Sequence, residues 1–159
     1  GAFGVLDLAL PREAFMKTSI RNILKQKGST VHTVRPDSTV FDALKAMADA
    51  NVGALLVMDG ERLAGIVSER DYARKVILKG RSSLDTRVDD IMSTRVICAR
   101  PEQSVEECMG LMTAKAVRHL PVLDHKEVVG IVSIGDLVKA IIGEQQHIIE
   151  QLEHYIHGH

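Results

Sequence analysis

The sequence predicts an α+β fold, α/β-like in its element order. Two pseudo-symmetric β-α-β-β-α motifs pack sheet to sheet, and a C-terminal helix follows them. The first observation is a stretch that begins at Gly65, Gly-Ile-Val-Ser-Glu-Arg-Asp, and returns at Gly130 as Gly-Ile-Val-Ser-Ile-Gly-Asp. Residues 31–71 and 96–136 also align without a gap and share roughly 14 of about 41 positions, which indicates an internal duplication. Hydrophobic residues form 45% of the 159-residue chain, enough for a full core.

The first motif is predicted to occupy residues 19–80, after an N-terminal arm or expression remnant over residues 1–18. The apolar spacing of Val40, Ala43, Leu44 and Met47 indicates a helix with one buried face, and Asn51-Val52-Gly53 ends it. The other expected elements are a short helix over 19–26, a strand over 31–34, strands over 54–58 and 63–68, and a helix over 69–78.

The second motif is predicted over residues 81–143, after the polar linker 79–83. Its expected elements are a strand over 96–99, a helix capped by Ser104, strands over 120–123 and 128–133, and a helix after Ser133. A sheet of this size leaves one face uncovered, and the other copy is its obvious partner. Packing about a pseudo-twofold axis is then expected to leave two symmetry-related clefts between the copies.

Each motif ends with a serine three residues before an aspartate, Ser68 with Asp71 and Ser133 with Asp136. This spacing places the serine at a helix N-cap and the aspartate one turn inside the helix. The exposed backbone N–H groups of such an end attract phosphate, and the carboxylate can accept both hydroxyls of a ribose. A capping box that only starts a surface helix is the structural alternative. Duplication of the pair with its surroundings favours two nucleotide pockets.

Composition narrows the class of function. The formal net charge is −1, aromatic residues are 3% and Trp is absent, which argues against a nucleic-acid binder. No stretch is apolar for long enough to span a membrane. Cys98 and Cys108 lie in apolar contexts, so we expect two buried, reduced thiols and a cytoplasmic location. No nucleophile motif, Walker loop or G-x-G-x-x-G is present, so we expect no catalysis.

Over residues 20–143 the chain resembles a tandem pair of cystathionine beta-synthase (CBS) domains, also called a Bateman module. The resemblance lies in Val31–Pro36, in Val96–Pro101, in Arg118-His119-Leu120-Pro121-Val122 and in the two glycine-led copies. It implies a regulatory sensor, often a disc-shaped dimer of modules, that binds AMP, ADP, ATP, NAD(H) or S-adenosylmethionine. It implies no catalytic residue. The regulated protein is not identified by the sequence.

The resemblance also assigns residues to two pockets. The first pocket combines Ile66, Ser68, Arg70 and Asp71 with Arg95, Val96, Arg118, His119 and Pro121. The second pocket combines Ile131, Ser133, Gly135 and Asp136 with Thr30, Val31, Gly53 and Ala54. In these pockets the aspartates accept ribose hydroxyls, the serines contact ribose or phosphate, and the strand backbones at Val96 and Val31 read the adenine edge. The cations of the first pocket meet phosphate.

The two pockets differ in charge. The second pocket has Gly135 and Gly53-Ala54 where the first has Arg70 and Arg118-His119. Three outcomes stay open for the second pocket: a less charged ligand, a cation borrowed from Arg118 or His119, or no ligand. A purely structural homodimerisation module with vestigial pockets is the competing function.

The tail, residues 144–159, is predicted to form an amphipathic helix. Its apolar positions recur at heptad-like spacing from residue 137, interrupted by Gly143: Ile141, Ile142, Ile148, Ile149, Leu152, Tyr155 and Ile156. We expect a second copy of the chain to cover this stripe in a homodimer, and the alternative is that the helix folds back on its own module. His154, His157 and His159 have no cysteine or carboxylate at ligand spacing, so no metal site is expected.

Overall fold

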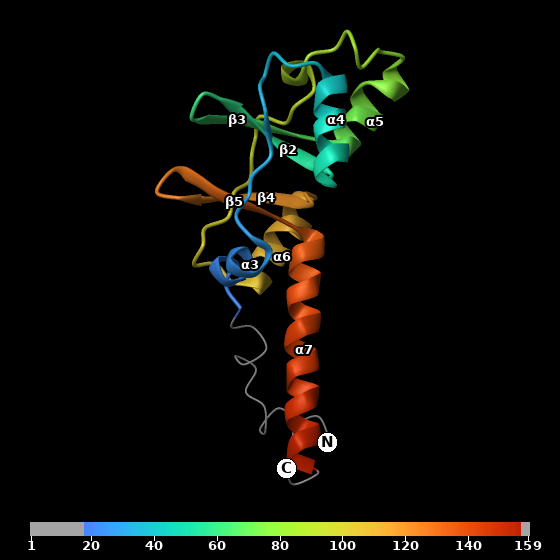
Figure 1. The fold of residues 1–159 in the computed structure, drawn as a ribbon. Helices are drawn as coiled ribbons and strands as arrows, with labels where there is room; N and C mark the ends of the chain where they lie inside the picture. The colour runs from blue at the N-terminus through green and yellow to red at the C-terminus, as the bar shows by residue number, and fades with distance from the viewer. Residues whose placement is uncertain (1–17, 157–159) are drawn as a thin grey trace. The chain divides into compact units, whose positions relative to one another are not determined.

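The computed structural model describes residues 18–156, so the predicted N-terminal arm lies, except for Thr18, outside the described residues, as do His157 and His159. The chain divides into two compact units. One contains residues 30–98, and the described part of the other contains residues 18–29 together with 99–156. Each unit is described by itself below, with the element labels of Figure 1.

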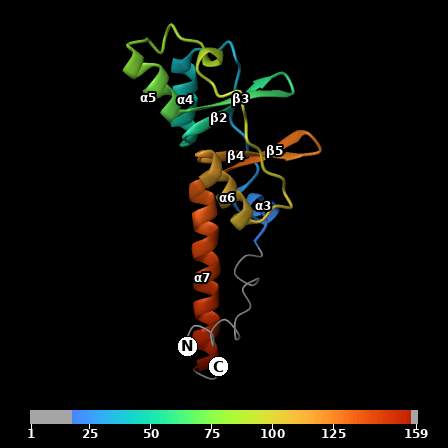
Figure 2. The same cartoon turned by 180° about the vertical axis from the view of Figure 1, so that it is seen from behind.

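The unit of residues 30–98 is built on a three-stranded sheet in the order β1-β2-β3. Its elements are β1 (Thr33–Val34), α4 (Val40–Ala50), β2 (Ala54–Asp59), β3 (Arg62–Ser68), α5 (Glu69–Lys75), and the 3-10 turns η1 (Ile77–Lys79) and η2 (Val88–Asp90). β1 pairs with β2 in parallel, and β2 pairs with β3 antiparallel. α4 packs on β2 and α5 on β3, as Figures 1 and 2 show.

Local chemistry sets the bounds of α4. Thr39 caps the helix, since its hydroxyl accepts the N–H of Asp42, and Asn51 ends it in the left-handed region at φ 55°. Val40, Ala43 and Met47 are buried, which confirms the predicted apolar face. This face packs with Leu55, Val57 and Val67 of the sheet and with Val76, Val88 and Ile91 in one core.

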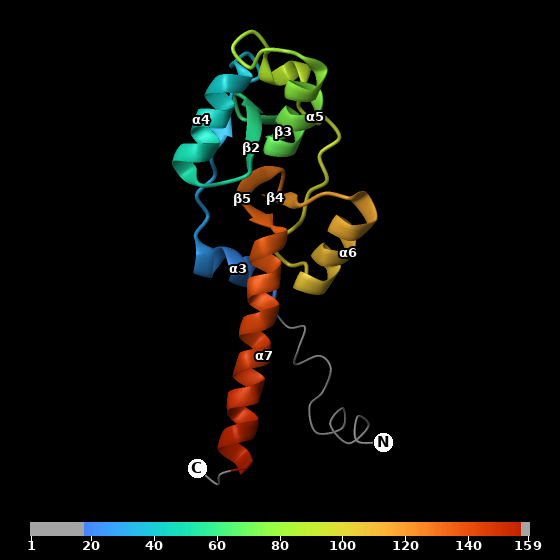
Figure 3. The same cartoon turned by 90° about the vertical axis from the view of Figure 1, so that its right-hand side faces the viewer.

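The described part of the second unit contains a two-stranded antiparallel sheet and three helices. Its elements are α3 (Ile20–Lys27), α6 (Val105–Lys115), β4 (His119–Asp124), β5 (Glu127–Ser133) and α7 (Ile134–Ile156). α3 contacts β5 and α7, and Figure 3 shows it alongside α7. The predicted strand over 96–99 is wrong except for its last residue. Only Ala99 pairs, with Val122 in a parallel bridge, because the chain passes from one unit to the other at this point.

Each repeat is bonded by a short segment that does not directly precede it in the chain. α3, grouped above with the first motif, lies in the unit of the second: the N–H groups of Ile20 and Arg21 donate to the carbonyls of Gln103 and Pro101. The matching bonds of the other unit come from the linker, where Val88 and Asp89 donate to Ser38 and Pro36. Each repeat is therefore completed by a segment that precedes the other repeat in the chain.

Two predicted helices differ from the structure. The helix expected over 69–78 is α5, which ends at Lys75, followed by the separate turn η1. Gly143 does not end a helix: it lies inside the 23-residue α7. A single glycine costs a helix only about 1 kcal/mol relative to alanine, which neighbouring turns can offset.

The two cysteines are free, as expected, but only Cys108 is buried. The prediction that both thiols are buried is wrong for Cys98, which is half-buried at the end of the unit of residues 30–98. Burial raises the pKa of the Cys108 thiol to about 11, with a further contribution from the charge of Glu107. Among residues 18–156, no helix is long and apolar enough to cross a membrane.

Candidate functional site

Each Ser–Asp pair lies where the last strand of a repeat runs into a helix. Ser68 ends β3 and caps α5: its N–H donates to Asp71 Oδ2 at 2.9 Å, and the Asp71 N–H donates to Ser68 Oγ at 3.2 Å. Ser133 ends β5 and forms the same two bonds with Asp136, at 2.8 and 3.2 Å. Both pairs therefore form the capping bonds that the structural alternative required. These bonds do not exclude ligand binding, since an ionised carboxylate has about four acceptor positions.

Asp71 is further bound by a lysine of its own helix. Lys75 Nζ lies 3.0 Å from Asp71 Oδ1 and donates to the carbonyl of Ile91 at 2.8 Å. The Asp71 side chain is 15% exposed. Spacing of four residues on a helix brings such side chains together, so this pair could be read from the sequence.

Asp136 is bound by a lysine from a distant part of the chain. Lys27, the last residue of α3, places Nζ 2.7 Å from Asp136 Oδ2 and donates to the carbonyl of Ile131 at 2.9 Å. Burial raises the pKa of the Asp136 carboxyl, but the hydrogen bonds from Lys27 and Ser133 outweigh it and leave that pKa lowered. Within the described chain, no hydrogen bond reaches Asp136 Oδ1, so this oxygen keeps its acceptor capacity.

Comparison of the two repeats did not reveal Lys27, since no sequence rule pairs residues 109 positions apart. Lys27 adds a cation to the Ser133–Asp136 pair, for which alignment of the two repeats had predicted no cation of its own. A hollow of about 530 Å³ lies next to this pair, between α3 and α7 of the same unit. Lys27, Asp136, Lys139 and Glu144 supply charged groups to its lining. Burial raises the pKa of Glu144.

In the unit of residues 30–98, residues predicted for different pockets are local neighbours. The Gly53 carbonyl accepts the N–H of Glu69 at 3.0 Å, and Ala54 pairs with Ser68 in the β2–β3 register. Ile66 forms a two-bond bridge with Ser93. Gly53 and Ala54, assigned to the second pocket, thus lie beside the Ser68–Asp71 pair. Thr30, Val31, Arg95 and Val96 belong to this unit as well.

The other unit repeats this arrangement. The Arg118 carbonyl accepts the N–H of Ile134 at 2.9 Å. His119 pairs with Ser133, and Pro121 pairs with Ile131. The residues that the first pocket was predicted to take from this repeat therefore lie beside the Ser133–Asp136 pair. The side chain of Arg118 is exposed, as are those of Arg70 and Arg95 in the other unit, and Gly135 in the first turn of α7 is exposed as well.

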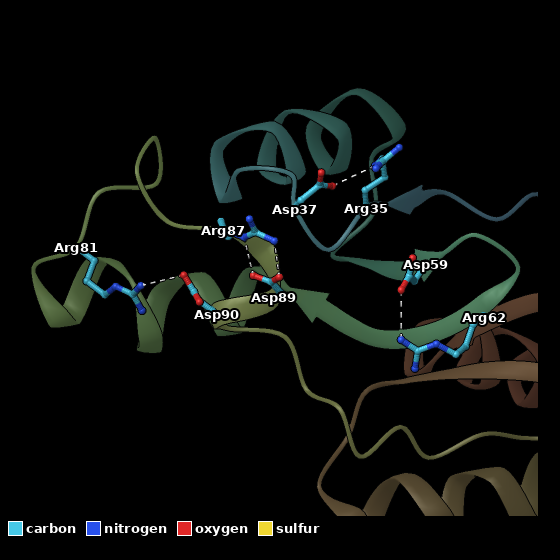
Figure 4. Close-up of polar contacts among 8 residues, drawn as sticks. All are labelled: Arg35, Asp37, Asp59, Arg62, Arg81, Arg87, Asp89 and Asp90. Carbon is cyan, nitrogen blue, oxygen red and sulfur yellow. Dashed lines mark hydrogen bonds and ion pairs between the residues drawn. The ribbon is translucent and has the colours of Figure 1, made fainter.

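A second charged surface lies in the unit of residues 30–98 (Figure 4). Arg87 binds Asp89 through two bonds of 3.1 and 2.8 Å, and Arg35 binds Asp37 at 3.1 Å. The Arg35 hydrogen bond lowers the pKa of Asp37, and the Arg87 hydrogen bond lowers that of Asp89. These residues line a hollow of about 420 Å³ with both signs of charge. Each arginine is engaged by its own aspartate, so we assign no phosphate site here.

The charged pairs at this surface contribute little to stability. In the Arg35–Asp37 pair the side chains are 80% and 52% exposed, and exposed ion pairs contribute about 0–1 kcal/mol. Within residues 18–156, no three His, Cys, Asp or Glu side chains gather in a metal-binding arrangement. The Ser–Asp pairs with their lysines are the strongest candidate sites among the described residues.

Comparison with known proteins identifies similar sequences and structures. The chain is 41% identical over 158 residues to the CBS domain-containing protein CBSX3, mitochondrial, of Arabidopsis thaliana, covering 94% of this chain and 77% of that protein. A putative signal-transduction protein with CBS domains from Burkholderia ambifaria MC40-6 is 53% identical, with a TM-score of 0.78 over 80% of this chain and 96% of that chain.

A second similar structure holds ligands. The CBS domain pair of protein MJ0100, in complex with 5′-methylthioadenosine and S-adenosyl-L-methionine, is 25% identical, with a TM-score of 0.72 over 80% of this chain and 98% of that chain. The family model for the CBS domain matches twice, at residues 20–78 and 88–143. The two matches include both Ser–Asp pairs and most of both units. The chain belongs to the CBS domain family, as a tandem pair of CBS domains.

Proposed function

We propose that this chain is a regulatory module, without enzymatic activity, that binds an adenosyl nucleotide: AMP, ADP, ATP or NAD(H). The observation that carries the proposal is the pair of half-buried aspartates, Asp71 and Asp136, each fixed by a serine and a lysine at the end of a strand. The adenosyl ligands of the MJ0100 domain pair support the chemical class of ligand.

In this proposal each carboxylate accepts ribose hydroxyls. A carboxylate that the fold already holds in place loses little further conformational entropy when it binds a diol, which favours binding. The exposed guanidinium groups of Arg70, Arg95 and Arg118 can bind phosphate through paired N–H groups. The residues that the resemblance assigns to the two pockets are carried forward as part of this proposal.

We further propose that the chain acts as a homodimer and that ligand binding is transmitted to a regulated protein. An energetic coupling between ligand and partner requires that the ligand bind one arrangement of the module more tightly than another. The chain itself offers no catalytic constellation among its described residues, so its output would be carried by contact with another protein.

A purely structural homodimerisation module is the second candidate. The observation that favours it is that capping bonds and lysines already engage both aspartates in the free protein. Gly53 and Gly135 add to it, since they replace side chains that would contact a ligand in the second pocket. In that case the Ser–Asp pairs serve only to start α5 and α7.

Thermal denaturation with AMP, ADP, ATP, NAD, NADH and S-adenosylmethionine separates the two functions. A ligand that binds only the folded state at 100 times its Kd stabilises it by about 2.7 kcal/mol and raises Tm. The doubly substituted protein Asp71→Ala/Asp136→Ala is the control and should show no ligand-dependent rise. If none of the six ligands raises Tm at millimolar concentration, the structural module is the correct reading.

A further inference from the structure

The helix α7 carries an exposed apolar stripe on one face. Val138, Ile142, Ile149 and Ile156 are 40%, 47%, 53% and 73% exposed, although they are large aliphatic side chains. Leu137 and Ile148, on another face, are buried in their own unit. The helix extends well past α3 and α6 of the same unit, as Figure 3 shows. The buried face of α7 therefore packs within its own unit, while the stripe stays exposed among residues 18–156.

The stripe follows a heptad repeat, in which successive seam positions are alternately four and three residues apart. The a positions are Ile142, Ile149 and Ile156, and the d positions are Val138, Gln145 and Leu152. We propose that this stripe pairs with the same stripe of a second copy, in a parallel two-stranded coiled coil. β-branched residues at a together with leucine at d favour two strands over three or four. All three a positions are isoleucine, and the central d position is the polar exception.

The polar exception selects the parallel orientation. In a parallel, in-register pair, each d residue faces the same d residue of the partner, so Gln145 meets Gln145 of the partner subunit. Two amides can donate to and accept from each other across the seam. In an antiparallel pair, Gln145 would face an isoleucine and lose its hydrogen bonds on burial. A single polar residue at the seam fixes register in this way in other coiled coils.

The residues that flank the seam allow this pairing. In a parallel dimer, each g position faces the e position of the next heptad of the partner, which here sets Ile141 opposite a glutamine and Ile148, already buried by its own unit, opposite a glutamate. No two like charges meet in these pairs. Lys139 also lies at an e position, whereas Glu144 and Glu150 lie at c and b, away from the seam.

The fold also prepares α7 for pairing. Its first turn is already fixed by the Ser133–Asp136 capping bonds and by Leu137, which is fully buried. The free-energy cost of nucleating the helix is therefore offset by packing within the unit, and pairing with a second copy only has to stabilise the last turns. Ile149 and Ile156 lie beyond residue 143, where the family match ends. The coiled coil gives a structure to the homodimer proposed above, and it does not depend on nucleotide binding.

Analytical ultracentrifugation of the full chain tests the proposal. We expect a dimer at micromolar concentration, and Ile149→Asp should weaken dimerisation at least tenfold because it places two carboxylates in the seam. Glu150→Lys, one residue along but at an outer position, is the matched control and should leave the dimer unchanged. Circular dichroism confirms that both variants fold. A monomeric wild-type chain, or an Ile149→Asp dimer of unchanged strength, overturns the proposal. Nucleotide binding retained by Ile149→Asp would show that the two functions are separate.

Cysteine cross-linking tests the orientation. In a Cys98→Ser background, with Cys108 left in place because it is buried, Gln145→Cys should form an intermolecular disulfide under mild oxidation. Glu150→Cys is the control at an outer position and should remain monomeric on a non-reducing gel. Cross-linking of the control with none at position 145 would overturn the parallel, in-register pairing.

Discussion

The ammonium of Lys27 lies 2.7 Å from Asp136 Oδ2, although the two residues are 109 positions apart in the sequence. The same nitrogen donates to the carbonyl of Ile131 at 2.9 Å. It thereby ties the end of α3 to β5 and to the first turn of α7. The equivalent lysine of the other repeat, Lys75, comes from the helix of Asp71 itself. The two Ser–Asp pairs thus carry similar charge by different routes.

Replacement of Lys27 by methionine should lower the free energy of unfolding at pH 7 by about 1 kcal/mol. The loss is smaller than for a fully buried charged hydrogen bond because the lysine is partly exposed. The pKa of Asp136 is lower in the folded protein than in the unfolded chain. The ionised carboxylate therefore stabilises the fold at any pH above the ordinary carboxyl pKa, and this stabilisation is lost as the pH falls through the folded pKa. The destabilisation should therefore shrink towards pH 3.

Urea denaturation at pH 7 and pH 3 measures this difference. Lys25→Met, an exposed lysine on the same helix, serves as the control and should change stability little at either pH. An equal loss at both pH values would show that Lys27 acts through packing of its aliphatic stem and not through its charge.

Asp71→Ala should weaken nucleotide binding at the first pocket by about tenfold to a hundredfold, because a charged hydrogen bond of about 1.5–3 kcal/mol is lost. It should also cost about 1 kcal/mol of stability, since the carboxylate completes the capping box of α5. Calorimetric titration measures the affinity and thermal denaturation the stability. Asp90→Ala, a half-exposed carboxylate of the same unit, is the control. Unchanged affinity in Asp71→Ala would remove this residue from the binding site.

The two pockets should differ in their dependence on phosphate. The first is predicted to include Arg70, Arg118 and His119, so AMP should bind it more tightly than adenosine does. At the second, Lys27 is already engaged by the Asp136 carboxylate, so the gain should be smaller. Titrations of AMP and adenosine into Asp136→Ala and Asp71→Ala isolate the first and second pockets in turn. An equal AMP preference in both variants would contradict the asymmetry.

Gly65→Ala should destabilise the unit of residues 30–98 by about 1–3 kcal/mol, as overpacking in a closely packed region does. A Cβ at this position would lie 2.7 Å from the Ser93 carbonyl oxygen and 2.9 Å from Met92 Sδ. The backbone oxygen cannot move without breaking its bond to the Ile66 N–H. Chemical denaturation measures the loss.

Gly110→Ala is the matched control for that experiment. Gly110 lies inside α6, and a Cβ there would meet nothing within 4 Å. The alanine should stabilise the helix by about 0.5–1 kcal/mol because it removes the conformational cost of glycine. Equal effects of the two substitutions would mean that the close approach at Gly65 is relieved without cost.

The repeat and its elements could be predicted because they depend on local chemistry. The apolar spacing of residues 40–47 and the N-cap positions of Ser68 and Ser133 each require only neighbours within about one helical turn. For the same reason the pairing of Asp71 with Lys75 was open to prediction. The predicted strand over 96–99 failed because a strand needs a partner, and pairing is set by where the chain leaves one unit for the other.

The sequence by itself determined the α+β class, the duplication, the CBS family and the two Ser–Asp pairs, since all of these are written in residue types at fixed spacing. Only the tertiary structure decided that α3 packs on the second repeat and that Lys27 meets Asp136, because these contacts join residues far apart in the chain. It also decided which apolar residues of α7 are buried and which are exposed. A heptad pattern gives the spacing of such residues, but burial depends on what else the fold brings to the helix.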